Sequence, residues 1–123
     1  MIAADSSSLR RYLDGRQGFD VNGVALAIDQ DDLIVPPVVI AELLSDPALP
    51  IRYAGKIFAL KTLELQAGYR IRSGELRANT LREGHKANLA DVLIAQSCID
   101  HDIPLITNDA DFRHFTRAGL KLA

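Results

Sequence analysis

Short apolar segments alternate with longer segments of mixed polarity along the chain. The short segments hold three or four residues, most of them aliphatic, and several end at proline or at small polar residues. Brief apolar runs of this kind are typical of strands that are buried on both faces of a sheet. We therefore predict strands at residues 2–4, 33–35, 63–65, 104–107 and 120–122.

The longer segments carry apolar residues three or four positions apart, which is the spacing of a helix with a buried face. Asp5 or the serines after it can cap the first helix, Asn22 can cap the second, and a proline suits the first turn of the third. The run at 89–99 has little polar surface, so it predicts the most deeply buried helix. The predicted helices lie around residues 9–13, 22–28, 38–44, 51–60, 69–81, 89–99 and 110–116.

The alternation of strands and helices determines the predicted fold class. Strands that are separated by helices pair in parallel, and the helices cover both faces of the sheet. A chain of 123 residues can bury one core, and the sequence shows no internal repeat, low-complexity tract or linker. We therefore expect a single α/β domain over residues 1–123.

Composition narrows the class of protein. Apolar residues make up 48% of the chain, which is too many for a disordered protein. No apolar run approaches the roughly 20 residues of a membrane span, and the first residues lack the pattern of a secretory signal. The single cysteine, Cys98, excludes an internal disulfide and lies in an apolar helical pattern, so we expect it to be buried. We expect a cytoplasmic protein without a membrane segment.

Five acidic residues fall at positions that this fold would bring together. Asp5 follows the first predicted strand, and Asp109 and Asp111 follow the fourth. Because parallel strands place their carboxyl ends at one edge, where open α/β sheets bind ligands, these residues should share that edge. Asp91 begins the predicted buried helix at 89–99, and Glu42 interrupts another apolar run and should be partly enclosed.

Each of these acidic residues also has an ordinary explanation. Asp5 and Asp91 could cap helices. Asp109 and Asp111 could form a turn, and Glu42 could point into solvent. These explanations do not account for the acidic residues as a group, which favours a shared site.

A divalent metal ion explains the group. Carboxylates that share one site repel each other unless a cation is present, and Mg²⁺ and Mn²⁺ prefer oxygen ligands. Zinc would need a cluster of cysteine and histidine, which the separated positions of these residues do not supply. A site of carboxylates alone indicates phosphoryl chemistry, in which the metal ion lowers the pKa of a bound water molecule and stabilises the charged transition state.

Two hydroxyl residues are secondary candidates. Thr107 is placed to orient Asp5 or Asp109 through a hydrogen bond, although a threonine in a strand needs no such role. Ser7 could donate to a metal-bound water or to a substrate phosphate, or it could simply cap the first helix.

The number of basic residues is compatible with a polyanionic substrate. The net charge is −2, and neutralising four carboxylates with metal would leave −2 + 4 = +2. Ten of the 14 basic residues are arginines, whose guanidinium groups match phosphate oxygens but can equally cover solvated helix faces. The candidates for phosphate contact are Arg10, Arg11, Arg82, Lys86 and Arg113.

Four motifs resemble those of the PIN-domain ribonucleases, particularly the VapC-type toxins of VapBC toxin–antitoxin pairs. They are Ile-Ala-Ala-Asp-Ser-Ser (2–7), Val-Val-Ile-Ala-Glu-Leu (38–43), Leu-Ala-Asp-Val-Leu-Ile-Ala (89–95) and Leu-Ile-Thr-Asn-Asp-Ala-Asp-Phe (105–112). They occur in the family's order and with similar separation, so the resemblance covers essentially the whole chain. Val92 stands where the family often has alanine, and no glycine closes the helix before Pro47, but neither departure touches an acidic position.

The resemblance implies a three-layer α/β/α fold with a central, mostly parallel sheet of about five strands. It implies hydrolysis of RNA with Mg²⁺ or Mn²⁺. Thr107 matches a serine or threonine that accompanies the acidic residues in the family. The implied catalytic and metal-binding residues are Asp5, Glu42, Asp91 and Asp109, with Asp111 as an additional metal ligand. The implied partners are an RNA substrate, a cognate antitoxin that blocks the site, and a second copy in a homodimer, with residues 51–81 as our candidate for partner contact.

Two other functions are compatible with this kind of domain. The first is a catalytically silent PIN-like module that binds RNA or a protein, although such a module would not need several mutually repelling carboxylates. The second is a metal-dependent phosphatase or phospho-acceptor domain that uses Asp5. That chemistry would need a second acid beside Asp5 or a suitably placed lysine, and three serines stand there instead.

Overall fold

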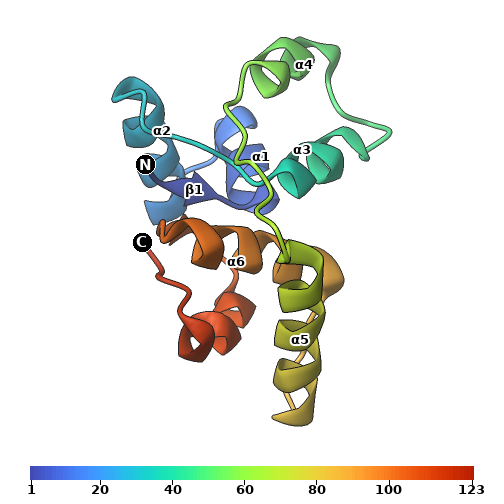
Figure 1. The fold of residues 1–123 in the computed structure, drawn as a ribbon. Coiled ribbons are helices and arrows are strands. Elements are labelled where there is room, and N and C mark those ends of the chain that lie inside the picture. The colour runs from blue at the N-terminus through green and yellow to red at the C-terminus, as the bar shows by residue number, and fades with distance from the viewer.

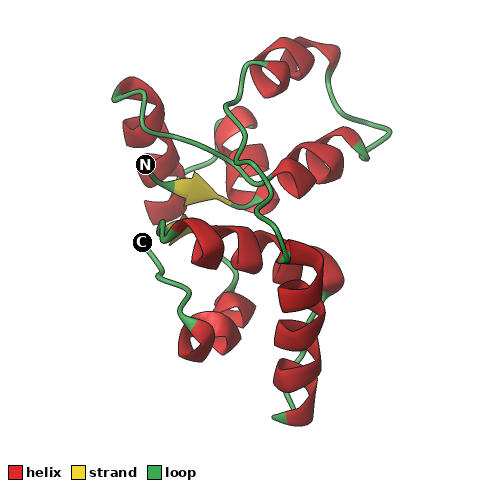
Figure 2. Cartoon of the chain, in the orientation of Figure 1, coloured by secondary structure: helices red, strands yellow, loops and turns green.

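The computed structural model describes residues 1–123 as six α-helices, one 3₁₀ helix and two short strands (Figures 1 and 2). Figure 1 shows α4 above β1, α2 beside it on the left, and α6 and η1 below it. No helix has the length and apolar character that crossing a membrane requires. In chain order the elements are β1 Ala3–Ala4, α1 Ser6–Leu13, α2 Phe19–Asp29, α3 Pro37–Leu44, α4 Ile51–Phe58, α5 Tyr69–Arg82, α6 Leu89–His101, β2 Leu105–Ile106 and η1 Ala110–Ala118.

The sheet is parallel, and β1 and β2 form its centre. Ala3 lies opposite Leu105, and Ala4 lies opposite Ile106. Three isolated parallel bridges continue this row outward, pairing Ile2 with Leu33, Val35 with Thr62, and Leu105 with Leu122. The α/β class with a parallel sheet is therefore confirmed.

Only two of the five predicted strands are regular. The segment 33–35 pairs through separate bridges at Leu33 and Val35, and the segment 120–122 pairs through one bridge at Leu122. The bridge near the predicted strand 63–65 lies at Thr62, one residue before that range. Proline limits one of them directly. Val35 exchanges two backbone hydrogen bonds with the chain around Thr62, but Pro36 follows at once and has no N–H with which to extend the ladder.

Helix α6 lies at the core, as its apolar sequence predicts. Val92, Ile94 and Ala95 are fully buried, and α6 contacts α3, α5 and η1. Cys98 is buried in the same helix, and burial raises the pKa of its thiol to about 12. This cysteine is therefore a packing residue, because its reactive thiolate form is suppressed.

The helix caps agree with the sequence predictions in part, and the predicted start of α6 at residue 89 is confirmed. Asp5 caps α1 as predicted, since its side chain accepts a hydrogen bond from the Ser8 N–H at 2.9 Å. Helix α6 is capped by Asn88, so Asp91 is not a cap and lies in the first turn instead. The prediction that Asn22 caps α2 is wrong, because α2 begins three residues earlier, after Gly18.

Gly18 explains the early start of α2. Its φ is +153°, and an added Cβ would lie 2.8 Å from Asp20 Oδ1 and 2.9 Å from Arg11 Nη2. Arg11 Nε donates to the buried Asp20 carboxylate at 3.0 Å, so the first turn of α2 is tied to α1. Only glycine permits this close approach of the two side chains to the backbone.

Candidate active site

The edge of the sheet brings Asp5 and Thr107 together. They follow β1 and β2 directly, and the pairing of these strands places them side by side. Thr107 Oγ1 donates to Asp5 Oδ2 at 2.6 Å and accepts from the Asp109 N–H at 3.0 Å. The hydroxyl therefore contacts both predicted partners, the side chain of Asp5 and the backbone of Asp109.

Asp5 is held in one orientation. Only 3% of the residue is exposed, and its carboxylate also accepts from the Ser8 N–H at 2.9 Å and from Ser7 Oγ at 3.3 Å. A buried carboxylate is tolerated only when it is hydrogen-bonded in this way. Ser7 therefore contacts Asp5, and its predicted contact with a phosphate or a metal-bound water stays a prediction.

Glu42 reaches the same region from α3. It is half-buried, and Ser6 Oγ at the start of α1 donates to its Oε1 at 2.9 Å. Sequence reasoning did not single out Ser6 as a site residue. Its position directly after the strand-end Asp5, within the same motif, was the available signal, because the first helical residue faces the same edge of the sheet.

Asp91 lies at the electrostatic centre of the site. It is half-buried in the first turn of α6. Burial, followed by the charges of neighbouring carboxylates, raises its pKa from 3.8 to about 6. In order of effect, the carboxylates that act on it are Asp109, Glu42, Asp5 and Asp111. The fold therefore brings all five predicted acidic residues into one field of negative charge.

Asp109 and Asp111 lie at the outer side of this field. Asp109 caps η1, and its Oδ1 accepts from the Asp111 N–H at 2.9 Å. His114 Nε2 lies 3.8 Å from Asp111 Oδ1. Asp109 is exposed and Asp111 is half-buried, so this side of the site faces solvent.

The donor chemistry of the group fits a hard divalent cation. Every acidic side chain offers oxygen. Burial and then the neighbouring negative charges raise the pKa of Asp91, and a bound cation would offset both by favouring the ionised form. No three of these side chains stand close enough to share one ion as they are placed. The residues that could hold Mg²⁺ or Mn²⁺ are thus brought to one region without forming a closed set of ligands.

Removing the Thr107 hydroxyl is expected to reduce any activity of this site without unfolding the protein. Thr107→Val keeps the branched shape of the side chain but deletes the donor to Asp5, and losing an orienting partner of this kind costs about 10- to 100-fold in activity. Thr107→Ser keeps the hydroxyl and should keep most of the activity. The measurement is kcat/KM for RNA cleavage, with melting temperatures as the check on folding. Equal losses in both variants would mean that the methyl group, and not the hydrogen bond, matters.

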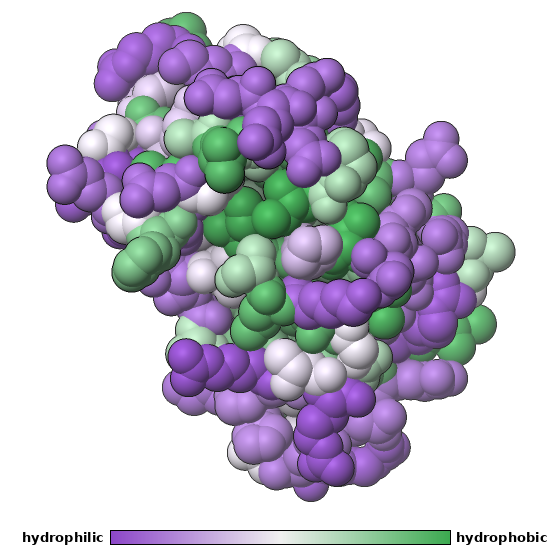
Figure 3. Space-filling view, turned by 90° about the vertical axis from the view of Figure 1, so that its left-hand side faces the viewer, coloured by the Kyte–Doolittle hydropathy of each residue, from purple (hydrophilic) through white to green (hydrophobic).

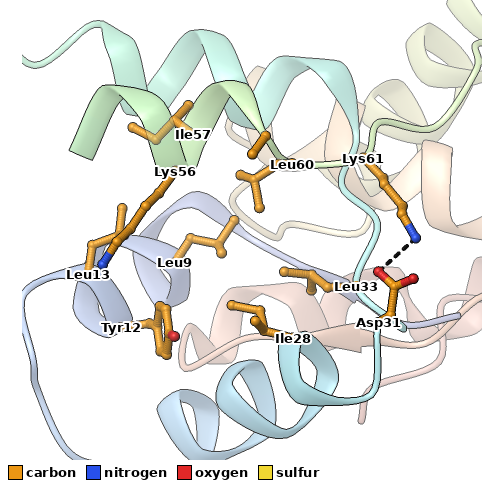
Figure 4. A pocket seen from close by; sticks show the side chains of 11 residues that line it. Leu9, Tyr12, Leu13, Ile28, Asp31, Leu33, Lys56, Ile57, Leu60 and Lys61 are labelled. Atoms are coloured by element: carbon orange, nitrogen blue, oxygen red, sulfur yellow. Dashed lines mark hydrogen bonds and ion pairs between the residues drawn. The ribbon is translucent and has the colours of Figure 1, made fainter. Parts of the chain in front are cut away.

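A second feature is an apolar groove of about 350 Å³ between α1, α4 and the end of α2 (Figure 4). Figure 4 shows Lys56 extending along this groove and Lys61 paired with Asp31 at its border. On the face seen in Figure 3, apolar residues form an area bordered by hydrophilic ones. None of the acidic site residues lines the groove, so it is a separate surface. Its lining residues are Leu9, Tyr12, Leu13, Ile28, Asp31, Leu33, Lys56, Ile57, Ala59, Leu60 and Lys61.

The protein is a parallel α/β domain, and its acidic side chains gather at the carboxyl edge of the sheet. This arrangement indicates the class of the protein. The chain matches the PIN domain family over residues 2–118, so it is a member of that family. No curated protein gives a significant match to it.

Three solved structures are similar in fold. A chain in the crystal structure of VapBC2 from Rickettsia felis, bound to a DNA fragment from their promoter, is 23% identical, with a TM-score of 0.75 and coverage of 100% of this chain and 98% of that chain. A chain of DNA-bound VapBC from Salmonella typhimurium is 19% identical, with a TM-score of 0.73 and coverage of 100% and 98%. A chain of FitAcB from Neisseria gonorrhoeae is 17% identical, with a TM-score of 0.74 and coverage of 99% and 96%. At these identities the likeness establishes the fold.

Proposed function

We propose that this PIN-domain protein is a metal-dependent endoribonuclease that hydrolyses RNA phosphodiester bonds, and that it is the toxin of a toxin–antitoxin pair. The observation that carries the nuclease proposal is the partial burial of Asp91 among four other carboxylates. Burial first, and then the charges of these neighbours, raise its pKa to about 6. Such perturbed carboxylates cluster at functional sites, because a structural role would not require keeping them together. The metal would be Mg²⁺ or Mn²⁺, the divalent ions that suit an all-oxygen site.

The residues that would hold the metal are Asp5, Glu42, Asp91 and Asp109, with Asp111 as a further ligand. A bound divalent ion supplies a water molecule of lowered pKa and neutralises charge on the phosphate. Thr107 fixes the carboxylate of Asp5 through its 2.6 Å hydrogen bond. Ser6 fixes Glu42 in the same way.

Three of the predicted phosphate contacts remain available. Arg82, Lys86 and Arg113 form no ion pair with a carboxylate. Arg10 and Arg11 are different, because Arg10 is paired with Asp14 and Asp46, and Arg11 is paired with Asp20. The pairs with Asp46 and Asp20 hold α1 against other parts of the chain, so Arg10 and Arg11 are less available to the substrate than the other three.

The nuclease proposal is tested by incubating the protein with a mixed pool of structured and single-stranded RNA in Mn²⁺, in Mg²⁺ and in EDTA. We expect cleavage with either metal and none in EDTA. A folded, metal-supplied protein that leaves a broad RNA pool intact would favour the catalytically silent module that binds RNA or protein. The desolvation and repulsion at Asp91 argue against that module, because nothing in silent binding would maintain them.

The toxin proposal names the apolar groove as the surface for the antitoxin. The three similar structures come from complexes named VapBC2, VapBC and FitAcB, and this groove is lined mostly by apolar side chains. Its α4 side falls within residues 51–81, the segment that the sequence analysis assigned to partner contact. Lys56 forms no ion pair, so an acidic side chain beside an apolar partner helix would complement it. We also infer a homodimer in the cytoplasm from the family resemblance.

Leu60→Glu is expected to weaken antitoxin binding by at least about 30-fold, because it places a charge in an apolar contact surface. RNA cleavage should be unchanged, since Leu60 is not among the acidic site residues. The matched control is Phe58→Glu, which adds the same charge at an exposed position of α4 that does not line the groove. The measurement is the Kd for a candidate antitoxin, which is to be sought as a small DNA-binding protein encoded by an adjacent open reading frame. If both variants bind with wild-type affinity, the antitoxin lies elsewhere.

A further inference from the structure

A pair of stacked histidines lies beside the acidic site. The ring centroids of His85 and His114 are 4.1 Å apart, and their planes differ by 13°. His85 follows the end of α5, while His114 lies in η1, so the stack joins two elements that are far apart in sequence. Gly84 turns the chain with a φ of +84°, and the His85 N–H donates to the Thr80 carbonyl at 3.2 Å. The pair is therefore held in place by the backbone on the α5 side.

The stack borders the acidic residues directly. His114 Nε2 lies 3.8 Å from Asp111 Oδ1, and Asp111 is one of the carboxylates whose charge acts on Asp91. A molecule that lies against the imidazoles would therefore be next to the group of carboxylates. The side chain of His114 is 28% exposed and His85 is exposed, so the stack is accessible from solvent.

Cationic residues without an ion pair stand close to both histidines in the sequence. Lys86 follows His85 in the chain and Arg113 precedes His114, and neither forms an ion pair. Arg82 lies one turn before His85 and bonds only the neutral side chain of Asn79. Positive charge next to exposed aromatic faces is the combination with which proteins bind single-stranded nucleic acid.

We propose that His85 and His114 form a platform on which an unpaired RNA base stacks, with the adjoining phosphates held by Arg82, Lys86 and Arg113. Unstacked bases bind to aromatic side chains, histidine included, and the contact tolerates any base because every base has a π-face. A base in a duplex stays stacked on its neighbours and cannot use the platform. The platform rests on the proposed RNA substrate, and it makes single-stranded RNA the preferred form of that substrate.

The test measures the Kd for single-stranded RNA by fluorescence anisotropy in the non-cleaving Asp91→Asn protein. This parent is compared with the same protein carrying His85→Ala or His85→Phe. His85 is exposed, so both substitutions should leave the protein folded. We expect His85→Ala to weaken binding by about 5- to 100-fold, which is the range for loss of one stacked base. His85→Phe retains a π-face and should bind within a few-fold of the parent. Arg70→Ala, at an exposed position near the other end of α5, is the control and should bind like the parent.

Two further measurements test the stacking platform independently of the nuclease proposal. In the cleaving protein, His85→Ala should raise KM while leaving kcat unchanged, and a duplex of the same sequence should show no effect of the substitution. Weaker single-strand binding by His85→Ala in a protein that never cleaves RNA would support the platform and overturn the nuclease. Unchanged binding by His85→Ala, or equal losses in the alanine and phenylalanine variants, would overturn the platform even where cleavage is observed.

Discussion

Asp91→Asn is expected to abolish RNA cleavage while making the metal-free protein more stable. The substitution removes one of the negative charges that would bind the metal. Loss of a residue that only orients a metal ligand costs up to about 100-fold in activity, so loss of the ligand itself should cost at least about 100-fold. The opposite effect on stability follows from the raised pKa of Asp91, since the folded state holds this ionised carboxylate at a cost.

The sign of the pH dependence can be worked out for this group. Its pKa is about 6 in the folded protein against 3.8 for the ordinary group, so folding favours the protonated form. The stability contributed by Asp91 is therefore highest below about pH 4, falls as the pH rises to about 6, and stays low above that. A shift of this size corresponds to about 3 kcal/mol, which solvent screening of the half-exposed side chain reduces to roughly 1–2 kcal/mol.

Urea unfolding in EDTA measures this effect. At pH 8 the Asp91→Asn variant should unfold at higher urea concentration than the wild type, and at pH 4 the advantage should disappear. Glu75→Gln is the control, because Glu75 is an exposed acid on α5 outside the site, and it should change neither stability nor cleavage. A variant of Asp91 that is less stable at pH 8 would show that the carboxylates are not in mutual repulsion.

Two substitutions of Asp5 should distinguish the contribution of its carboxylate to stability from its contribution to RNA cleavage. Asp5→Ala removes the cap of α1 and leaves the Ser8 N–H and the Thr107 hydroxyl without their acceptor. We expect a loss of about 2–3 kcal/mol in the free energy of unfolding. Asp5→Asn keeps an oxygen acceptor and is an equally good cap, so its loss should stay within about 1 kcal/mol.

Both Asp5 variants should nevertheless lose RNA cleavage, because neither carries the negative charge that the metal requires. Stability comes from urea unfolding in EDTA at pH 7.5, and activity comes from the same RNA substrate with Mn²⁺. Normal cleavage by Asp5→Asn would show that the charge of Asp5 is dispensable. Wild-type stability of Asp5→Ala would show that the hydrogen bonds of Asp5 do not stabilise the fold.

Much of the fold follows from local sequence pattern. The helices could be located because their apolar spacing is strong, and α6, whose sequence leaves little polar surface, is deeply buried. The regularity of the strands could not be predicted, since it depends on how far each segment pairs, as the stop at Pro36 shows. The start of α2 was also missed, because it depends on the close packing of Arg11 and Asp20 against Gly18.

The grouping of the acidic residues could be predicted because parallel topology places strand ends at one edge, and the structure brings Asp5, Glu42, Asp91, Asp109 and Asp111 into one field of charge. Their assignment as metal ligands stays a proposal. The contact of Ser6 with Glu42 joins residues 36 positions apart, which no local pattern reveals. The ion pairing of Arg10 makes it less available to phosphate, and part of this pairing is visible in the sequence, because Asp14 lies four residues later on the same helix face.

The most direct test of the metal site is a calorimetric titration of Mn²⁺ into the wild-type protein at pH 7.5 and at pH 5. Protons compete with the metal for Asp91, and one pH unit below a pKa of about 6 only about a tenth of that group is ionised. We expect binding at pH 7.5 and an affinity about tenfold lower at pH 5, with a much weaker response in Asp91→Asn at either pH. Equal affinity in wild type and variant, or no binding at pH 7.5, would contradict the proposed metal site.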